Sequence, residues 1–164
     1  MTPPLDARIL LRPATEADRA TLVDFRLAMF EDMRATEPGG MAPPAELEAL
    51  RPGNEQWMAD HLGRDFVAWI AELDGRPVAG AGLFWILNPP GPRNPSGKEA
   101  YILNVYTRPE ARRMGLARAL MERLVEEARA AGVRRIWLRA SADGRPLYEA
   151  MGFRPGSYLQ LTPG

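Results

Sequence analysis

Several residue types that support common chemistries are absent or rare in this chain. Its 164 residues include no cysteine and one histidine, His61. No disulfide, thiolate metal site or cysteine nucleophile can therefore form, and a histidine-rich metal site or a Ser-His-Asp triad is disfavoured. Basic and acidic residues balance at 21 each, so no net positive charge draws the chain to nucleic acid or to an anionic membrane. We expect no metal, nucleic acid or membrane partner.

Long apolar runs are also missing. The longest, glycines included, is Val78 to Leu87, well short of the roughly 20 residues that a membrane-spanning helix needs. Residues 1–6 carry no basic segment followed by an apolar run, so no secretory signal is expected. Hydrophobic residues make up 46% and charged residues 26%, as in ordinary globular proteins. We expect a single domain over residues 1–164 and a cytoplasmic location.

Apolar periodicity and turn residues predict the order of elements. The expected strands are 8–12, 65–73, 78–87, 99–107 and 135–140, with one or two closing strands in 153–161. The expected helices are 15–34, 46–50, 55–62, 115–131 and 145–151. Asp74-Gly75 is a strong hairpin signal between two of the strands. This order predicts a three-layer α/β (α+β) domain in which helices cover both faces of a mixed sheet.

The turn before the helix at 115–131 carries the strongest chemical signal. A short basic segment with Arg112 and Arg113 leads into a helix that begins at Gly115. The first N–H groups of a helix have no partner within it, and with the helix dipole they attract an anion, which a glycine lets approach closely. Arg118 adds forked donors, so the turn suits a pyrophosphate. The dinucleotide Gly-x-Gly-x-x-Gly fingerprint and the Gly-Lys-Ser/Thr loop are absent, which disfavours those two nucleotide classes.

Two segments resemble the GNAT superfamily of N-acetyltransferases. Arg112-x-x-Gly115-x-Ala117 lies after Pro109 and before an amphipathic helix, and it resembles the acetyl-CoA signature of that family. The segment Leu147-Tyr-Glu-Ala-Met-Gly-Phe153 resembles its Leu-Tyr-x-x-x-Gly-Phe segment. The spacing between the two, and the element order over nearly the whole chain, are also similar. The resemblance implies a mostly antiparallel sheet and the transfer of an acetyl group from acetyl-CoA to a primary amine.

The resemblance also implies which residues bind acetyl-CoA. The pantetheine arm would pair like an extra strand with exposed backbone at the end of the strand 99–107. Ser141 stands where the family often has an asparagine that contacts the pantetheine. The pyrophosphate would lie on the turn before the helix, with Arg118 alongside. The implied cofactor-binding residues are Val105, Tyr106, Thr107, Arg112, Arg113, Met114, Gly115, Leu116, Ala117, Arg118 and Ser141.

The motif match makes Tyr148 the general acid, because a phenol is neutral near pH 7 and can protonate a departing thiolate. Its local pattern alone is typical of a buried aromatic residue. A base for the amine is less defined. The family often uses a glutamate on the strand 99–107, where Glu99 is the candidate, or a chain of waters. Asn104 is more central but cannot act as a base. The alternatives are Glu31, Asp32, Glu37 and His61.

With no cysteine to form a covalent thioester, direct attack of the amine in a ternary complex is the simplest route. Two other functions stay open: a non-catalytic acyl-CoA-binding sensor or regulatory module, and a small nucleotide-binding α/β protein. The acceptor is expected to be a small molecule or a peptide N-terminus, and a homodimer is expected from the type of domain.

Overall fold

The computed structural model describes residues 5–36, 43–157 and 159–161. The described strands are β1 (Ile9–Pro13), β2 (Phe66–Leu73), β3 (Arg76–Leu87), β4 (Lys98–Thr107) and β5 (Arg135–Leu138). The helices are α1 (Arg19–Thr36), α2 (Pro44–Ala49), α3 (Arg51–His61), α4 (Leu116–Ala130) and α5 (Arg145–Ala150). Two 3-10 turns, η1 (Glu16–Asp18) and η2 (Pro109–Ala111), precede α1 and α4.

The strands form one mixed sheet in the order β1-β2-β3-β4-β5. The first four strands pair antiparallel in sequence, and β5 pairs parallel to β4. The turn between β2 and β3 is made by Asp74 and Gly75, with φ of 51° and 76°. This is the left-handed backbone that a two-residue hairpin needs. The predicted mixed, mostly antiparallel sheet and its hairpin are confirmed.

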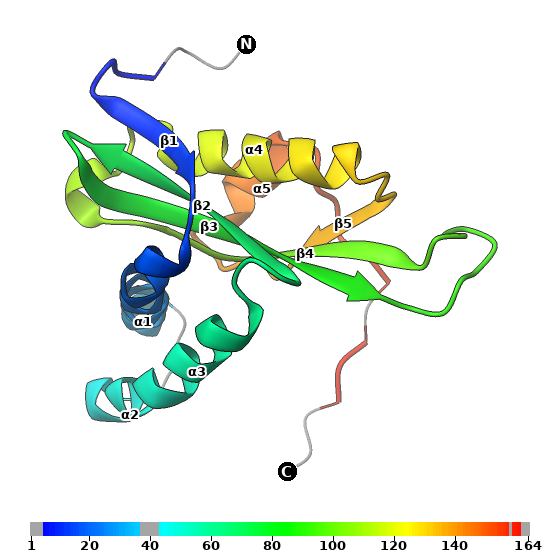
Figure 1. The fold of residues 1–164 in the computed structure, drawn as a ribbon, viewed down its shortest axis with the longest axis horizontal. Coiled ribbons are helices and arrows are strands. Elements are labelled where there is room, and N and C mark those ends of the chain that lie inside the picture. The colour runs from blue at the N-terminus through cyan, green and yellow to red at the C-terminus, as the bar shows by residue number, and fades with distance from the viewer. Residues whose placement is uncertain (1–4, 37–42, 158, 162–164) are drawn as a thin grey trace.

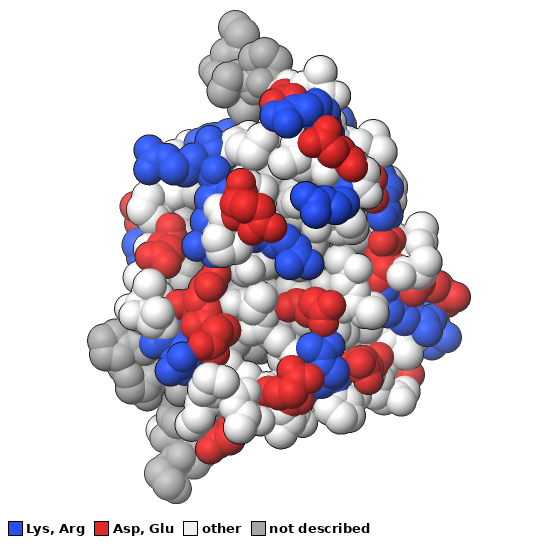
Figure 2. Space-filling model, turned by 90° about the vertical axis from the view of Figure 1, so that its left-hand side faces the viewer, with Lys and Arg blue, Asp and Glu red and all other residues white. Residues whose placement is uncertain are grey.

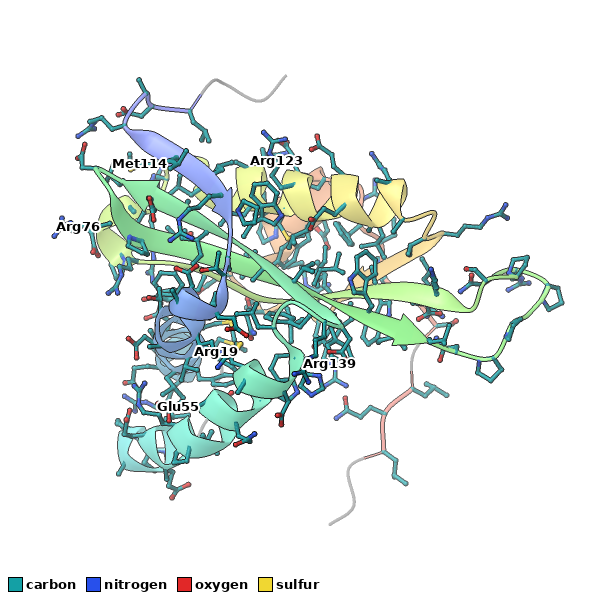
Figure 3. All side chains as sticks on the ribbon, in the orientation of Figure 1. Arg19, Glu55, Arg76, Met114, Arg123 and Arg139 are labelled. Atoms are coloured by element: carbon teal, nitrogen blue, oxygen red, sulfur yellow. The ribbon has the colours of Figure 1, made fainter. Side chains whose placement is uncertain are left out.

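Helices cover both faces of this sheet (Figure 1). On one face α4 and α5 pack over a core that includes Leu83, Ile102 and Leu120. On the other face α1 and α3 cover a second core that includes Val23 and Phe66. Arg123 of α4, labelled in Figure 3, has its guanidinium 5.7 Å from the centre of the Trp69 ring of β2. The predicted three layers are confirmed.

The closing strands expected in 153–161 are not present in the described part of that segment. Residues 153–157 and 159–161 form no strand, and Leu159 and Leu161 are exposed. The physical reason lies in Pro155 and Gly156: proline donates no N–H to a ladder, and glycine carries no side chain to pack and loses more backbone entropy in a strand.

An ion network fastens the start of α1 to the sheet. Arg12 on β1 donates to both carboxylate oxygens of Asp18, at 2.8 and 2.9 Å, and its Nε donates to Glu72 on β2 at 2.7 Å. Asp18 is buried and also accepts the backbone N–H of Thr15 at 2.8 Å. The hydrogen bonds from Arg12 lower the pKa of Asp18 to about 2, against the opposing effect of burial. The network therefore positions α1 against β1 and β2.

One face of the molecule carries interleaved charges rather than a field of one sign. Figure 2 shows acidic and basic side chains alternating over the face that lies at the left of Figure 1. Within the described residues, no helix is both long enough and apolar enough to cross a membrane.

Candidate active site

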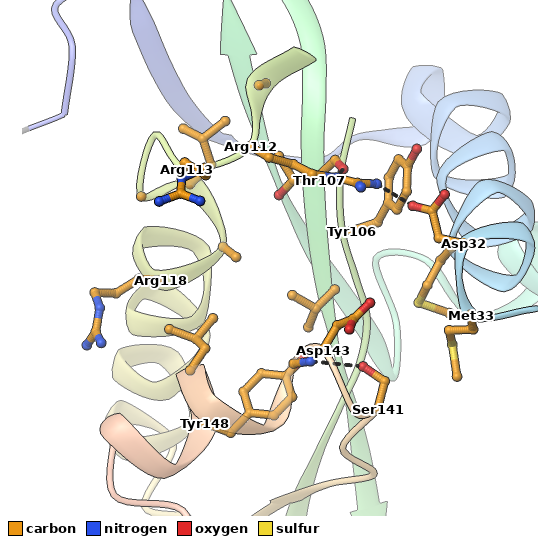
Figure 4. A pocket seen from close by; sticks show the side chains of 18 residues that line it. Asp32, Met33, Tyr106, Thr107, Arg112, Arg113, Arg118, Ser141, Asp143 and Tyr148 are labelled. Atoms are coloured by element: carbon orange, nitrogen blue, oxygen red, sulfur yellow. Dashed lines mark hydrogen bonds and ion pairs between the residues drawn. The ribbon is translucent and has the colours of Figure 1, made fainter. Parts of the chain in front are cut away.

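A cleft of about 580 Å³ opens where β4 separates from β5. The two strands pair only from Glu99 opposite Arg135 to Ile102 opposite Leu138, so the second half of β4 is free on that edge. Figure 4 shows α1 on one side of β4 and α4 with α5 on the other. The lining residues are Met29, Asp32, Met33, Val105, Tyr106, Thr107, Ala111, Arg112, Arg113, Gly115, Leu116, Ala117, Arg118, Ser141, Asp143, Gly144, Leu147 and Tyr148.

A β-bulge in β4 aims this backbone at the cleft. Gly80 on β3 lies opposite Tyr106 and Gly82 lies opposite Leu103, so β4 fits one extra residue into the interval. Asn104 takes up the irregularity with a left-handed φ of 58°. A bulge bends its strand and increases the local twist. The sequence signal that points here is weak, because no motif marks the bulge.

The turn into α4 leaves N–H groups unpaired. Gly115 is the N-cap residue, with a left-handed φ of 79° and no side-chain cap. A Cβ at Gly115 would meet only the Cδ2 of Leu5, at 3.8 Å, so the surface there is open. Arg113 also has a positive φ, of 65°. Strained backbone of this kind clusters at ligand sites. The local geometry therefore suits an anion held by backbone donors.

The arginines of the turn divide into two kinds. Arg112 is tied in place, because its Nε donates to the carbonyl of Thr107 at 3.1 Å and its Nη2 pairs with Asp32 of α1. Arg113 and Arg118 line the cleft and form no ion pair with a described residue. Met114, expected to contact acetyl-CoA, does not line the cleft and packs on the core beneath α4, near β1 (Figure 3).

Tyr148 lies in the first turn of α5 and is 8% exposed. It lines the cleft, and its hydroxyl forms no hydrogen bond with another described residue. Burial raises the pKa of Tyr148 above its ordinary value, so the phenol is neutral at physiological pH. Gly144 makes room for it: a Cβ there would lie 3.0 Å from the Tyr148 hydroxyl. Sequence reasoning missed Gly144, although it stands just before this motif.

Ser141 has a structural role that is visible in the cleft wall. Its Oγ accepts the backbone N–H of Gly144 at 3.1 Å (Figure 4), and its carbonyl accepts the N–H of Arg145 at 3.0 Å. The hydroxyl therefore shapes the loop that leads into α5. Asp143 in the same loop also lines the cleft, and sequence reasoning missed it. Its position between Ser141 and the Tyr148 motif is the signal that could have identified it.

The expected bases are spread over the molecule. Glu99 does not line the cleft, since its two oxygens accept from Arg135 at 3.2 Å and from the indole of Trp137 at 3.1 Å. His61 lies outside the cleft as well, with Nδ1 2.7 Å from Asp65. Asp32 lines the cleft and is paired with Arg112.

Neither of the two remaining candidates is found at the cleft among the described residues. Glu31 does not line the cleft and pairs with Arg34 at 2.6 Å. Glu37 lies outside the described residues.

The fold and the cleft are those of an acyltransferase, and comparison with known proteins gives the family. Residues 27–153 match the acetyltransferase (GNAT) family, so this chain belongs to the GNAT acetyltransferases. It is 30% identical over 120 residues to the ribosomal protein bS18-alanine N-acetyltransferase of Escherichia coli K12, covering 69% of this chain and 74% of that protein. The family membership that the two motifs implied is confirmed.

Two solved structures share both the fold and about a third of the residues. A GCN5-related N-acetyltransferase from Ralstonia eutropha JMP134 is 31% identical, with a TM-score of 0.82 over 94% of this chain and 98% of that chain. A predicted acetyltransferase from Clostridium acetobutylicum, solved with acetyl-CoA, is also 31% identical, with a TM-score of 0.83 over 94% of this chain and 96% of that chain. Acetyl-CoA is thus present in the structure of a relative of this chain.

Proposed function

We propose that this acetyltransferase transfers the acetyl group of acetyl-CoA to a primary amine by direct attack within a ternary complex. The observation that carries the proposal is a juxtaposition in one cleft. The free edge of β4, the uncapped start of α4 and the buried Tyr148 all line it. Each supplies one requirement of thioester aminolysis: a strand-like edge, an anion site and a proton donor.

The residues present fit CoA. The open surface at Gly115 supports close approach of a phosphate to the backbone, and the first N–H groups of α4 are free to donate. Arg113 and Arg118 are available as cations, whereas Arg112 is held by Asp32 and stiffens the turn. We assign the stabilisation of the oxyanion that forms at the carbonyl carbon to backbone N–H groups near Val105 to Thr107.

Proton transfers are assigned to two side chains. Tyr148 donates its proton to the departing thiolate sulfur, a role supported by its neutral, buried phenol. Asp143 lines the cleft without an ion pair to a described residue, so we assign to it the deprotonation of the acceptor's ammonium group. It takes the proton through water before the amine attacks. No covalent acetyl-enzyme is needed, and the chain has no cysteine to form one.

An amine panel with acetyl-CoA, monitored by thiol release, tests the proposal. Because the protein contains no cysteine, the assay has no background from the enzyme. The similarity to a ribosomal protein alanine acetyltransferase places peptides with an N-terminal alanine in the panel beside small amines. Initial-rate plots should intersect; parallel lines, or an enzyme acetylated by acetyl-CoA alone, would overturn direct transfer.

The alternative is a non-catalytic acyl-CoA-binding sensor. It predicts CoA binding without thiol release for every amine in the panel, and the buried Tyr148 hydroxyl on the cleft argues against it. A homodimer and a cytoplasmic location stay predictions.

A further inference from the structure

Arg26 is a half-buried cation on α1 and is not itself among the residues that line the cleft. It precedes Met29 by three residues and Met33 by seven, so the three share one face of α1. Met29 and Met33 both line the cleft. Arg26 therefore lies about one turn before Met29 on the same face of α1, on the side of β4 opposite to α4.

The contacts of Arg26 are all neutral. Its Nε donates to Oδ1 of Asn54 at 2.7 Å, and its Nη1 donates to Oδ1 of Asn104. The guanidinium lies 4.7 Å from the centre of the Phe30 ring. Its Nη2 has no hydrogen bond to a described residue, and no described carboxylate is within ion-pair distance. Burial lowers the pKa of Arg26, as expected for a cation without a counter-ion.

The acidic residues of α1 do not compensate this charge. Asp24 pairs with Arg51 at 2.8 Å, and Glu31 pairs with Arg34 at 2.6 Å. Asp32 pairs with Arg112 across the cleft. Each described carboxylate of α1 thus pairs with an arginine other than Arg26. Half-burying an unpaired charge is costly unless something supplies the opposite charge.

A second donor lies beside the guanidinium. Asn104 is 9% exposed, and its Nδ2 is buried without a hydrogen-bond partner in the described structure. Its Oδ1 faces Arg26, so the free Nδ2 of the same amide lies next to the arginine. The following residue, Val105, lines the cleft where the acyl group would lie. A buried donor left unpaired in this way points to a missing acceptor oxygen.

We propose that Arg26, with Asn104 beside it, binds a carboxylate on the acceptor, so that the preferred acceptors are amines that carry a carboxylate group. This inference rests on the proposed function. A carboxylate accepts from guanidinium and amide N–H donors at once, and such charge-assisted hydrogen bonds are the strong ones. The carboxylate belongs either to a free amino acid or to an acidic side chain near a peptide N-terminus.

Matched acceptors test the proposal on the unmodified enzyme. Alanine, alaninamide and ethylamine share a primary amine but differ in the carboxylate, as do the dipeptide amides Ala-Asp-NH2 and Ala-Asn-NH2. We expect kcat/KM to be at least about tenfold higher for the carboxylate member of one set. The set whose members differ in kcat/KM shows whether the carboxylate belongs to a free amino acid or to an acidic side chain near a peptide N-terminus. Equal kcat/KM within both sets overturns the proposal.

Substitutions then assign the preference to Arg26. Arg26→Gln should reduce the carboxylate preference to about one, and Arg26→Lys should restore part of it. Arg34→Gln is the control, since it removes an arginine that lies on the same helix and pairs with Glu31. A loss that is equal for all acceptors would mean that Arg26 only supports the β4 bulge, and it would overturn the proposal.

A binding measurement separates this inference from the proposed function. Calorimetry in the presence of CoA needs no turnover and uses acetylated products from both sets: N-acetylalanine against N-ethylacetamide, and N-acetyl-Ala-Asp-NH2 against N-acetyl-Ala-Asn-NH2. One outcome is carboxylate-dependent binding that Arg26→Gln abolishes, together with no thiol release from any amine. This outcome would refute the proposed function and support the carboxylate site. Thiol release with no carboxylate-dependent binding would refute the site alone. Circular dichroism confirms that each variant is folded.

Discussion

The two sides of the cleft are built in different ways. The α4 side consists of a turn and a helix start contributed by consecutive residues, 112–118, and its donors are backbone N–H groups. The α1 side consists of side chains, and one of them, Asp32, pairs with Arg112 from a distant part of the chain (Figure 4). A site made of local backbone is recognisable in a sequence, whereas a site made of distant side chains is not.

One contact joins the two sides. Arg112 of the turn pairs with Asp32 of α1, although the residues are 80 positions apart. The Arg12–Asp18–Glu72 network in turn holds the beginning of α1. The α1 side therefore depends on contacts that the α4 side does not need, and substitutions should separate the two.

Tyr148→Phe is expected to have the largest effect, and it tests the chemistry between the two sides. Removing a general acid costs about 10²–10⁴-fold in rate. We expect kcat to fall within that range while CoA affinity stays within a few-fold, because the hydroxyl acts as charge develops on sulfur. Steady-state kinetics and calorimetry measure the two quantities. A parental kcat would leave water as the proton donor, and an earlier melting transition would indicate a structural tyrosine.

Gly115→Glu breaks the α4 side alone. The carboxylate brings negative charge to the anion site, and the left-handed φ strains any side chain, so CoA affinity should fall about 100-fold in calorimetry. Gly115→Ala carries the same backbone strain without the charge, and its Cβ has open space. If both variants lose the same CoA affinity, backbone strain rather than charge controls binding at this turn. If Gly115→Glu binds CoA as tightly as the parent, the phosphate does not lie on this turn.

Asp18→Asn tests the anchor of the α1 side. The pKa of Asp18, lowered to about 2 by Arg12, corresponds to a stabilisation of about 2 kcal/mol at pH 7. Because the folded-state pKa is lowered, this stabilisation is present above the ordinary carboxyl pKa of roughly 3.9 and is lost as the pH falls to about 2. Denaturant unfolding of both proteins at pH 7 and pH 3 should show a difference that shrinks on acidification. A constant difference contradicts the assignment.

Glu99→Gln should have the smallest effect. Its carboxylate accepts from Arg135 and Trp137 and does not line the cleft, so kcat should change by less than about threefold. Asp143→Asn is the matched carboxylate on the cleft, where a larger loss of kcat/KM is expected. If steady-state kinetics shows a larger loss for Glu99→Gln than for Asp143→Asn, Glu99 and not Asp143 is the base.

Most of the fold was predictable because its signals are local. The Asp74-Gly75 turn, the apolar face of α4 and the alternation along β4 each identify an element within a few residues. The turn at Gly115 and the Tyr148 motif were recognisable for the same reason. The expected strand at 153–161 was the exception, because Pro155 and Gly156 outweigh the apolar residues that follow them.

The sequence by itself determined the family, the element order and the anion-binding turn, since each depends on residues close together in the chain. Only the tertiary structure decided which carboxylates reach the cleft, that Met114 packs on the core, and that Arg26 lies against Asn104 without a counter-ion. The physical reason is that side-chain pairing across elements depends on how α1 crosses β4. That crossing is set by packing over the whole sheet, not by the local pattern of either element.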